Sequence, residues 1–421
     1  MNEVRNILVG IEIGRTCAQI CYFDRRQAEP VSIPTKVGTN QYAFPVSLAK
    51  MEGKEEWHFG FEADFFGKRE NGILCPNPFE TAQQEAPVLI DGKEYEAHEL
   101  LAIFLGEALK MLGVPHPVQA IAGICVTCGN LTRLLAEHIY SALRLLGLAP
   151  EKCHVCDNEE SFYYYGYSMK PEVRAREMGL IRFSGNVASF SLMEESRSRK
   201  PAVVTITETA HTALPEEAEE RDAAFSEAVK QWTEGMNFSG IFITGEGFGV
   251  DWAKSSVKTL SRAASHVFEG DNLFVKGACW AVYERTERHA FAGRLYLGPD
   301  QVRATVGIDV IEGGQQQFLP LVSAGTRYYA CDTSVDILPD GRDDLMVTVR
   351  YADSAAHRNE RVVLEGLPVR PHRATRLRLS VHCPDVSSCV IGAEDLGFGE
   401  MFAATHRKWT LHVCLDREEK A

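Results

Sequence analysis

A carboxylate stands beside a glycine turn near the start of the chain. Glu12 lies at the end of an apolar, β-rich run, Ile7–Ile13, and Gly14, Arg15 and Thr16 separate this run from a second one. Glycine at the bend allows a tight turn and lets backbone N–H groups face an anion. A carboxylate beside such a turn suits Mg²⁺, because this hard cation prefers oxygen ligands. The stretch predicts a magnesium-assisted phosphate site or, as the alternative, an ordinary β-hairpin.

Two further patterns place glycine where a strand ends. Gly179–Leu192 contains two apolar runs separated by a turn at Gly185. Gly240–Gly249 begins as a buried-type strand and opens into glycines, and we expect a helix over 252–266. Each pattern predicts a backbone turn at the end of a strand, where N–H groups can meet a ligand.

Two Cys-x-x-Cys pairs, Cys125–Cys128 and Cys153–Cys156, have the spacing of zinc ligands. Both pairs lie in or just beyond predicted core strands. Residues i and i+3 of a strand point to opposite faces, so one strand cannot present both thiols of a pair to one metal ion. We therefore interpret these cysteines as small, buried hydrophobic side chains.

The two cysteine-bearing strands belong to a predicted strand–helix–strand unit. A strand over 120–127 precedes a helix with Asn130 as its expected N-cap and Gly147 at its end. A second strand follows over 152–156. Such a unit predicts a parallel pair of strands with a right-handed crossover. An amphipathic helix over 95–112 precedes the unit.

Length, charge and cysteine content limit the class of protein. The 421 residues suffice for two or three domains, and the net charge of −14 argues against a nucleic-acid or anionic-membrane binder. No apolar run reaches the roughly 20 residues that span a bilayer, and Met1–Val4 lacks the apolar core of a signal peptide. Twelve cysteines suggest reduced thiols. We therefore expect a cytoplasmic protein without nucleic-acid or membrane partners.

The sequence changes character near residue 300. From about Val302, short alternating strands and turns replace the helical patterns, as in Leu345–Arg350 and Arg376–Val381. Runs of such strands are typical of an antiparallel sandwich. We therefore divide the chain into an α/β part, residues 1–300, and an all-β part, residues 301–421.

Several landmarks resemble the actin-like ATPase superfamily, most closely the DnaK-type heat-shock chaperones. Gly10-Ile-Glu-Ile-Gly-Arg-Thr-Cys17 is similar to their first phosphate hairpin, Gly-Ile-Asp-Leu-Gly-Thr-Thr-Asn. Asn158–Tyr167 follows a strand as their Asn-Glu-Pro-Thr segment does. Gly240–Gly249 and Asn272–Ala281 together resemble their adenosine motif, and Leu364–Pro368 matches a Leu-X-Gly-Leu-Pro segment of their substrate-binding domain.

This resemblance implies an actin-like (ribonuclease H-like) α/β core of two lobes over 1–300, its second lobe reduced. It implies a β-sandwich over 301–421, like the chaperones' substrate-binding domain without the helical lid. ATP or ADP with Mg²⁺ is the implied cofactor, Glu12 the metal ligand and a catalytic residue, and Glu159 the catalytic acid, with Asp157 competing for that position. The implied nucleotide-binding residues lie at the three turns: Gly14, Arg15, Thr16, Gly185, Gly245, Glu246, Gly247 and Gly249.

The chain departs from the family pattern at its catalytic positions. Glu12 replaces an Asp, Phe183 stands where the second hairpin carries an Asp, and the segment 79–86 contains no Lys. Phosphoryl transfer needs positioned Mg²⁺, a cation and a water-orienting carboxylate, so these losses predict weak or absent hydrolysis. We expect a degenerate ATPase of chaperone or adaptor type that binds a polypeptide or protein partner through 301–421. A scaffold without nucleotide and a small-molecule kinase are the alternatives.

Overall fold

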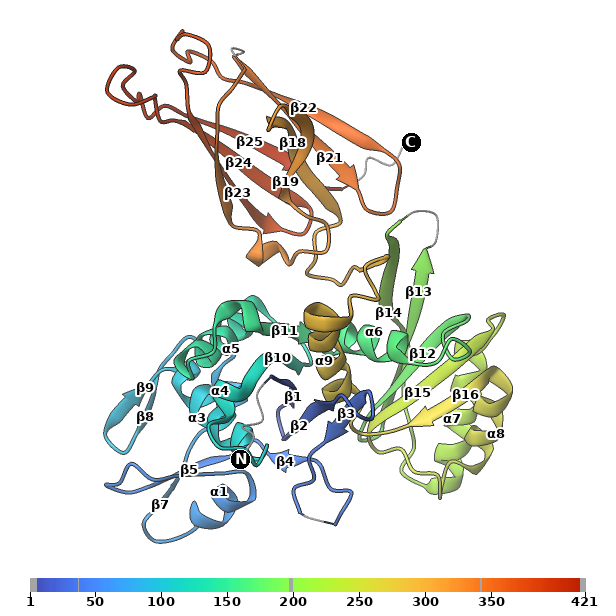
Figure 1. Ribbon diagram of the computed structural model, residues 1–421. Coiled ribbons are helices and arrows are strands. Elements are labelled where there is room, and N and C mark those ends of the chain that lie inside the picture. Colours follow the sequence, from blue (N-terminus) through green and yellow to red (C-terminus); the bar gives the residue numbers. More distant parts are fainter. Residues whose placement is uncertain (1–5, 37, 197–199, 341–342, 417–421) are drawn as a thin grey trace. The chain divides into compact units, whose positions relative to one another are not determined.

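The computed structural model describes residues 6–36, 38–196, 200–340 and 343–416 of the chain (Figure 1). The chain divides into two compact units. The first comprises Met1–Glu194 and Ile206–Phe291, and the second comprises Glu195–Thr205 and Ala292–Ala421. The second unit therefore takes in a short segment from the middle of the chain as well as everything after Phe291.

A mixed sheet lies at the centre of the first half of the chain. Its strand order is β11-β10-β1-β2-β3, and β4 also pairs with β2. β1 is antiparallel to β2 and parallel to β10, and β10 is parallel to β11, which confirms the predicted parallel pair. The strands are β1 (Ile7–Ile13), β2 (Cys17–Asp24), β3 (Glu29–Ser32), β4 (Phe44–Pro45), β10 (Ile121–Cys128) and β11 (Cys153–Asp157).

A second sheet repeats this order. It reads β16-β15-β12-β13-β14-β17, with β12 antiparallel to β13 and parallel to β15, and β15 parallel to β16. In both sheets the first strand is central, the next two follow on one side, and two parallel strands follow on the other. The strands are β12 (Glu177–Ser184), β13 (Val187–Ser196), β14 (Ala202–Ala213), β15 (Phe238–Glu246), β16 (Ala264–Glu269) and β17 (Arg294–Tyr296).

Two predicted helix boundaries are wrong. α8 (Lys254–Ala263) ends before the predicted residue 266, because the next six residues form β16 and pair with β15. The valine and phenylalanine of that stretch favour an extended chain at a sheet edge. α5 (Arg133–Leu145) is capped by Thr132, whose hydroxyl accepts the Leu135 N–H at 3.2 Å, and not by Asn130.

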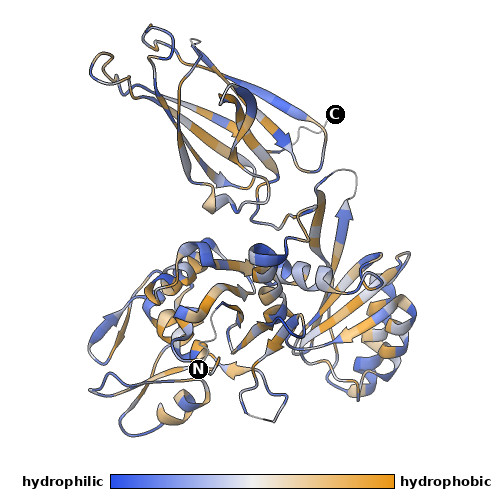
Figure 2. Cartoon of the chain, viewed as in Figure 1, coloured by the Kyte–Doolittle hydropathy of each residue, from blue (hydrophilic) through white to orange (hydrophobic). Residues whose placement is uncertain are grey.

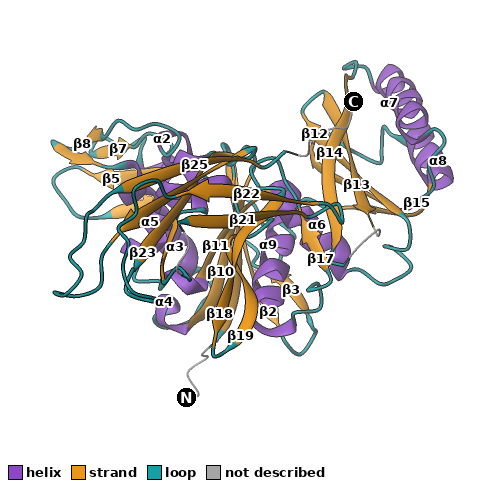
Figure 3. Ribbon diagram, turned by 90° about the horizontal axis from the view of Figure 1, so that it is seen from above, coloured by secondary structure: helices purple, strands orange, loops and turns teal. Residues whose placement is uncertain are grey.

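Helices cover the sheets of the first unit. Hydrophobic residues dominate its strands (Figure 2), and α7 (Ala218–Thr233) and α8 lie side by side (Figure 3). Phe225 and Leu260 of these helices join Ile181 and Phe190 of the second sheet in one core. None of the described helices has the length and apolar character that crossing a membrane requires. The other elements before residue 170 are α1 (Gly60–Phe66), α2 (Pro78–Thr81), α3 (Ala97–Lys110), α4 (Pro117–Ala120), α6 (Asn158–Ser168), β5 (Leu48–Met51), β6 (Trp57–Phe59), β7 (Gly72–Leu74), β8 (Val88–Ile90) and β9 (Lys93–Tyr95).

Helix α9 (Leu273–Tyr283) follows β16 of the second sheet in sequence but packs on β1, β2, β3 and β10 of the first. Glycines permit this close approach. A Cβ at Gly10 would lie 2.5 Å from the Val275 carbonyl oxygen, and one at Gly123 would lie 2.6 Å from Val282 Cγ1. Gly277 of α9 meets α6 in the same way, since its Cβ would lie 2.1 Å from the Ser161 carbonyl oxygen. At Gly10 and Gly277 the contacts are therefore with backbone, and at Gly123 the contact is with a side chain.

We expect Gly10→Ala to destabilise the first unit by about 3 kcal/mol, because the new methyl group meets the backbone of α9 and not a side chain that can rotate. Denaturant unfolding followed by circular dichroism measures this change. Gly129→Ala, at the end of β10, is the matched control, because its nearest neighbouring atom lies 3.6 Å away. Equal stability of the two variants would contradict the role given to Gly10.

The second unit is built from two antiparallel sheets, β19-β18-β21-β22 and β20-β23-β24-β25. Val306 and Val349 of one sheet share a core with Leu379 and Ile391 of the other. Residues 304–414 thus form sheets separate from the one that holds β1. The strands are β18 (Ala304–Glu312), β19 (Gln315–Val322), β20 (Thr333–Ile337), β21 (Asp344–Tyr351), β22 (His357–Val363), β23 (Leu377–Asp385), β24 (Ser388–Asp395) and β25 (Lys408–Cys414).

A buried ion pair holds the loops at one end of this unit. Arg370 donates two hydrogen bonds to Asp395, at 2.6 and 2.7 Å, and both side chains are almost fully buried. Asp395 also accepts hydrogen bonds from the Gly397 and Thr405 backbone N–H groups. The Arg370 guanidinium holds the pKa of Asp395 well below its ordinary range. The Asp395 carboxylate therefore links the loop that carries Arg370 to the loop that contains Gly397 and Thr405.

We expect Arg370→Ala to cost about 3–5 kcal/mol of stability, because it leaves the Asp395 charge buried without its cation. Arg378→Ala is the control. Its partner is Asp336, but the two side chains are 51% and 34% exposed, and such pairs contribute less than about 1 kcal/mol. Denaturant unfolding of both variants tests the contrast, and losses of similar size would contradict it.

Candidate functional site

The turn between β1 and β2 is held by protein contacts. The Gly14 N–H donates to the Cys17 carbonyl at 2.9 Å, and Asn77 Nδ2 donates to the Arg15 carbonyl at 2.8 Å. Arg15 and Thr16 are exposed, and the Arg15 guanidinium pairs with Glu80 at the start of α2. The chain therefore turns where it was predicted to, but the positive charge of Arg15 is paired with Glu80.

The other two glycine turns contact each other. The Gly185 N–H donates to the Glu246 carbonyl at 2.9 Å. Gly245 and Gly247 have φ of +95° and +120°, and added Cβ atoms would lie 2.1 Å from the carbonyl oxygens of Phe183 and Gly185. The close pairing of β12 with β15 therefore accounts for these glycines without a nucleotide. Further along, a Cβ at residue 249 would lie 3.2 Å from the Trp252 ring, so Gly249 also serves packing.

The end of β12 presents different residues to its two sides. Phe183 is buried among Phe225, Phe248 and Trp252 in the core of the second sheet. Successive strand residues face opposite sides, so the preceding Arg182 points the other way. Arg182 pairs with Glu159 of α6, and its guanidinium lies over the Phe274 ring, 5.4 Å from the centroid. The position expected to supply an Asp is therefore occupied by the buried Phe183, and its neighbour Arg182 places a cation on the opposite side of the strand.

Glu12 lies beside the first turn of α9, within the influence of Arg182. Burial raises the pKa of Glu12 to about 7, a change opposed by a hydrogen bond with the Val275 backbone and by the Arg182 charge, and reinforced by Asp271. Glu12 Oε2 is buried without a hydrogen-bond partner, and so is Arg182 Nε. We call Glu12, Glu159 and Arg182 the carboxylate–arginine group.

The structure separates the two candidates for the catalytic acid. Asp157 is the N-cap of α6, and its carboxylate accepts the Glu160 N–H at 2.6 Å. Glu159 instead contacts Arg182. Sequence patterns named Glu12 and Glu159 but missed Arg182. The signal was available: a buried Phe183 requires its strand neighbour to face the opposite side.

The residues of this group do not fit a magnesium ion. Mg²⁺ takes carboxylate, phosphate and water oxygens in near-octahedral geometry. Here the one nearby carboxylate from β1 binds its proton up to about pH 7, and an arginine faces it from β12. The N–H groups of Gly14 and Gly185 are already donated to carbonyls. The second hairpin therefore supplies no acidic ligand at Phe183, and of the other carboxylates near Glu12, Glu159 is paired with Arg182.

These features define a two-unit protein with a repeated strand order, an internal ion pair and an all-β second unit. Residues 29–299 match the C-terminal part of a family of unknown function (DUF5716). This match covers well over half of the chain, and the chain belongs to that family. Residues 301–415 match a domain of unknown function (DUF8552). No curated protein matches the chain.

We expect Glu12→Gln to remove a pH-dependent cost to stability. The native pKa of about 7 exceeds the ordinary value of 4.5, so the native state holds the proton more tightly than the unfolded chain. Ionisation of Glu12 between these values then lowers stability, by up to about 3 kcal/mol above pH 7. The Gln variant should match the wild type near pH 4.5 and exceed it at pH 8.

Denaturant unfolding of wild type and variant at several pH values from 4.5 to 8 measures this difference. Glu172→Gln, at an exposed carboxylate in the loop before β12, is the control and should show no such trend. A constant difference between wild type and Glu12→Gln over this range would contradict the assignment.

Proposed function

We propose that this protein is a divergent, DnaK-like member of the actin-like superfamily that does not turn over ATP. It acts as a chaperone-type or adaptor protein and binds a polypeptide or protein partner through residues 301–421. The repeated strand order of the two sheets supports the actin-like architecture, together with the glycine turns at the ends of β1, β12 and β15. The two antiparallel sheets of the second unit support a partner-binding β domain.

The carboxylate–arginine group carries the proposal that hydrolysis is absent. An ATPase of this superfamily needs acidic groups to hold Mg²⁺ from both sheets. This chain supplies Glu12 from the first sheet and Arg182 from the second, and Arg182 is paired with Glu159. A neighbouring cation repels Mg²⁺, and an ion-paired Glu159 is not free to orient water. ATP or ADP binding stays a prediction, and the following experiment tests it together with hydrolysis.

In a single-turnover assay with labelled Mg-ATP, we expect wild type, Glu12→Ala and Glu159→Ala to release phosphate at the same background rate. Each lost charge-stabilising group commonly costs about 10²–10³ in rate, so a working site would separate the three proteins clearly. Wild-type hydrolysis that either substitution abolishes would overturn the proposal. The variant Gly245→Val is unsuitable here, because its side chain meets the Phe183 carbonyl whether or not nucleotide binds.

Thermal melting with ATP, in the presence and absence of Mg²⁺, tests nucleotide binding separately, since a ligand of the native state raises the melting temperature. We expect a small shift that does not need Mg²⁺ and that Arg182→Ala removes, because the Arg182 charge acts on Glu12 beside the first turn of α9. No shift under either condition would favour the scaffold without nucleotide.

Exposed apolar side chains at one end of the second unit support partner binding. Strand registers place the loop residues Leu338, Val369, Phe398 and Met401 beyond the same ends of β20, β23 and β24. All four are exposed, and Val369 is completely so. Hydrogen bonds of Asp395 and Arg370 hold two of these loops, so the apolar side chains on them are held in place. An extended apolar peptide suits such a surface.

Fluorescence anisotropy of a labelled, apolar, extended peptide tests this surface. The double variant Val369→Asp, Met401→Asp should weaken binding at least tenfold, since charge opposes apolar contact. Leu89→Asp, at an exposed leucine of the first unit, is the matched control and should bind as the wild type does. Equal binding by all three proteins would place the partner site elsewhere.

We also propose a cytoplasmic location. All twelve cysteines lie in the described part of the chain, and each is a free thiol there. Reducing compartments preserve such thiols.

A further inference from the structure

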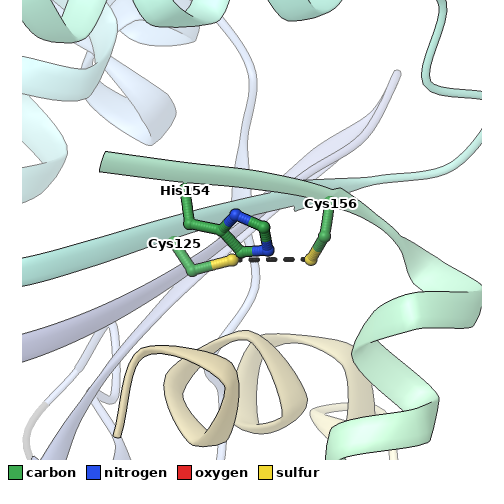
Figure 4. A group of neighbouring side chains, drawn as sticks. All are labelled: Cys125, His154 and Cys156. Atoms are coloured by element: carbon green, nitrogen blue, oxygen red, sulfur yellow. Dashed lines mark hydrogen bonds between the residues drawn. The ribbon is translucent and has the colours of Figure 1, made fainter. Parts of the chain in front are cut away.

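Three metal-binding side chains meet beneath α9 in the first sheet. The parallel register of β10 and β11 sets Cys125 opposite His154 and Thr127 opposite Cys156, so both cysteines and the histidine share one face. The two sulfur atoms, Cys125 Sγ and Cys156 Sγ, lie 3.4 Å apart, and the ring of His154 lies beside them (Figure 4). All three ligand atoms lie within 4.8 Å of one another.

This group takes one cysteine from each Cys-x-x-Cys pair. Cys128 and Cys153 fall on the opposite face of the sheet, as the strand alternation in the sequence predicts. The conclusion that one strand cannot present both thiols of a pair is therefore confirmed. It overlooked that neighbouring strands, brought into register by the crossover helix, present three ligands together.

The chemistry of the group suits zinc. Thiolate sulfur binds Zn²⁺ at about 2.3 Å and imidazole nitrogen at about 2.0 Å, so two sulfurs in a tetrahedral site lie about 3.8 Å apart. The observed sulfur separation of 3.4 Å is close to that value. Two thiolates also neutralise the charge of the ion. A neutral complex is compatible with this position, where both cysteines are fully buried.

Glu160 provides the support that zinc-bound histidines commonly receive. Its Oε1 lies 3.0 Å from His154 Nε2, and the two side chains are 6% and 15% exposed. A carboxylate in this place fixes the orientation of the ring and strengthens the histidine as a ligand. The backbone N–H of Glu160 is bound by Asp157, so the first turn of α6 holds the carboxylate in place.

We propose that Cys125, His154 and Cys156 bind one Zn²⁺ ion, which links β10 to β11 beneath α9. Binding replaces the two thiol protons, which leave to solvent, by two zinc–sulfur bonds. Because each ligand lies on a core strand, the ion has a structural role: it holds together the parallel pair on which α6 and α9 pack.

Cobalt is the probe, because Co²⁺ bound tetrahedrally to thiolates gives a strong charge-transfer absorption. The full chain, reduced and stripped with a chelator, should bind one equivalent of Co²⁺ with this absorption and release it when Zn²⁺ is added. Cys156→Ser and His154→Gln should each weaken binding by about 100-fold or more. Zn²⁺ should raise the melting temperature of the wild type but not of these variants.

Cys153→Ser is the matched control, because it alters the other cysteine of the same pair and should leave binding unchanged. Cys383→Ser tests a separate thiol cluster in the second unit, where Cys383 contacts Cys331 and Cys389. Circular dichroism of each variant verifies that it folds. The proposal fails if the wild type gives no cobalt–thiolate absorption. It also fails if binding survives Cys156→Ser, or if Cys383→Ser abolishes it.

Discussion

The structure of the first unit depends on one close contact, that of α9 with the backbone of β1 and β10. Gly10 meets the backbone of α9, Gly123 makes room for the Val282 side chain of α9, and Gly277 lets α6 approach α9 closely. The chain reaches α9 only after it has formed β12 to β16 of the second sheet. One helix therefore ties the second half of the unit to the first, and its first turn brings Phe274 and Val275 to the carboxylate–arginine group.

The chemistry of that group follows from which side of β12 each residue faces. Had Phe183 been the polar residue and Arg182 the apolar one, the second sheet would lack a cation at this place. As it stands, the aromatic core fixes Phe183 among Phe225 and Trp252, and the alternation of the strand commits Arg182 to Glu159. The packing of Phe183 therefore decides on which side of β12 the Arg182 charge lies. A strand anchored by three aromatic contacts cannot easily turn over to present another side chain.

Sequence patterns predict most of the helices and strands but few of the tertiary contacts that position the candidate sites. Periodicity located α3, α5 and the parallel strands, since these are local properties. It missed β16, because the six residues gain their strand partners only from β15. The family resemblance, and not periodicity, assigned Gly245 and Gly247 to a nucleotide, although the nearest atoms are backbone carbonyls of β12 and its turn. Register between distant strands, which joins Cys125 to His154, is not a local property at all.

The same contact explains why thiols accumulate beneath α9. A helix that touches the sheet backbone leaves room for small side chains at the points of contact, and Cys21, Cys125, Cys156 and Cys279 share that core with larger residues such as Phe23. The Cys21 thiol donates to the Val275 carbonyl and the Cys279 thiol to the Leu8 carbonyl, so each of these thiols has a backbone acceptor. Cys125 and Cys156 face each other instead. Thiols are weak donors, so this second pair gains little from mutual contact. Zinc–sulfur bonds would replace this weak contact between Cys125 and Cys156 by a strong link between β10 and β11, the strands beneath α6 and α9.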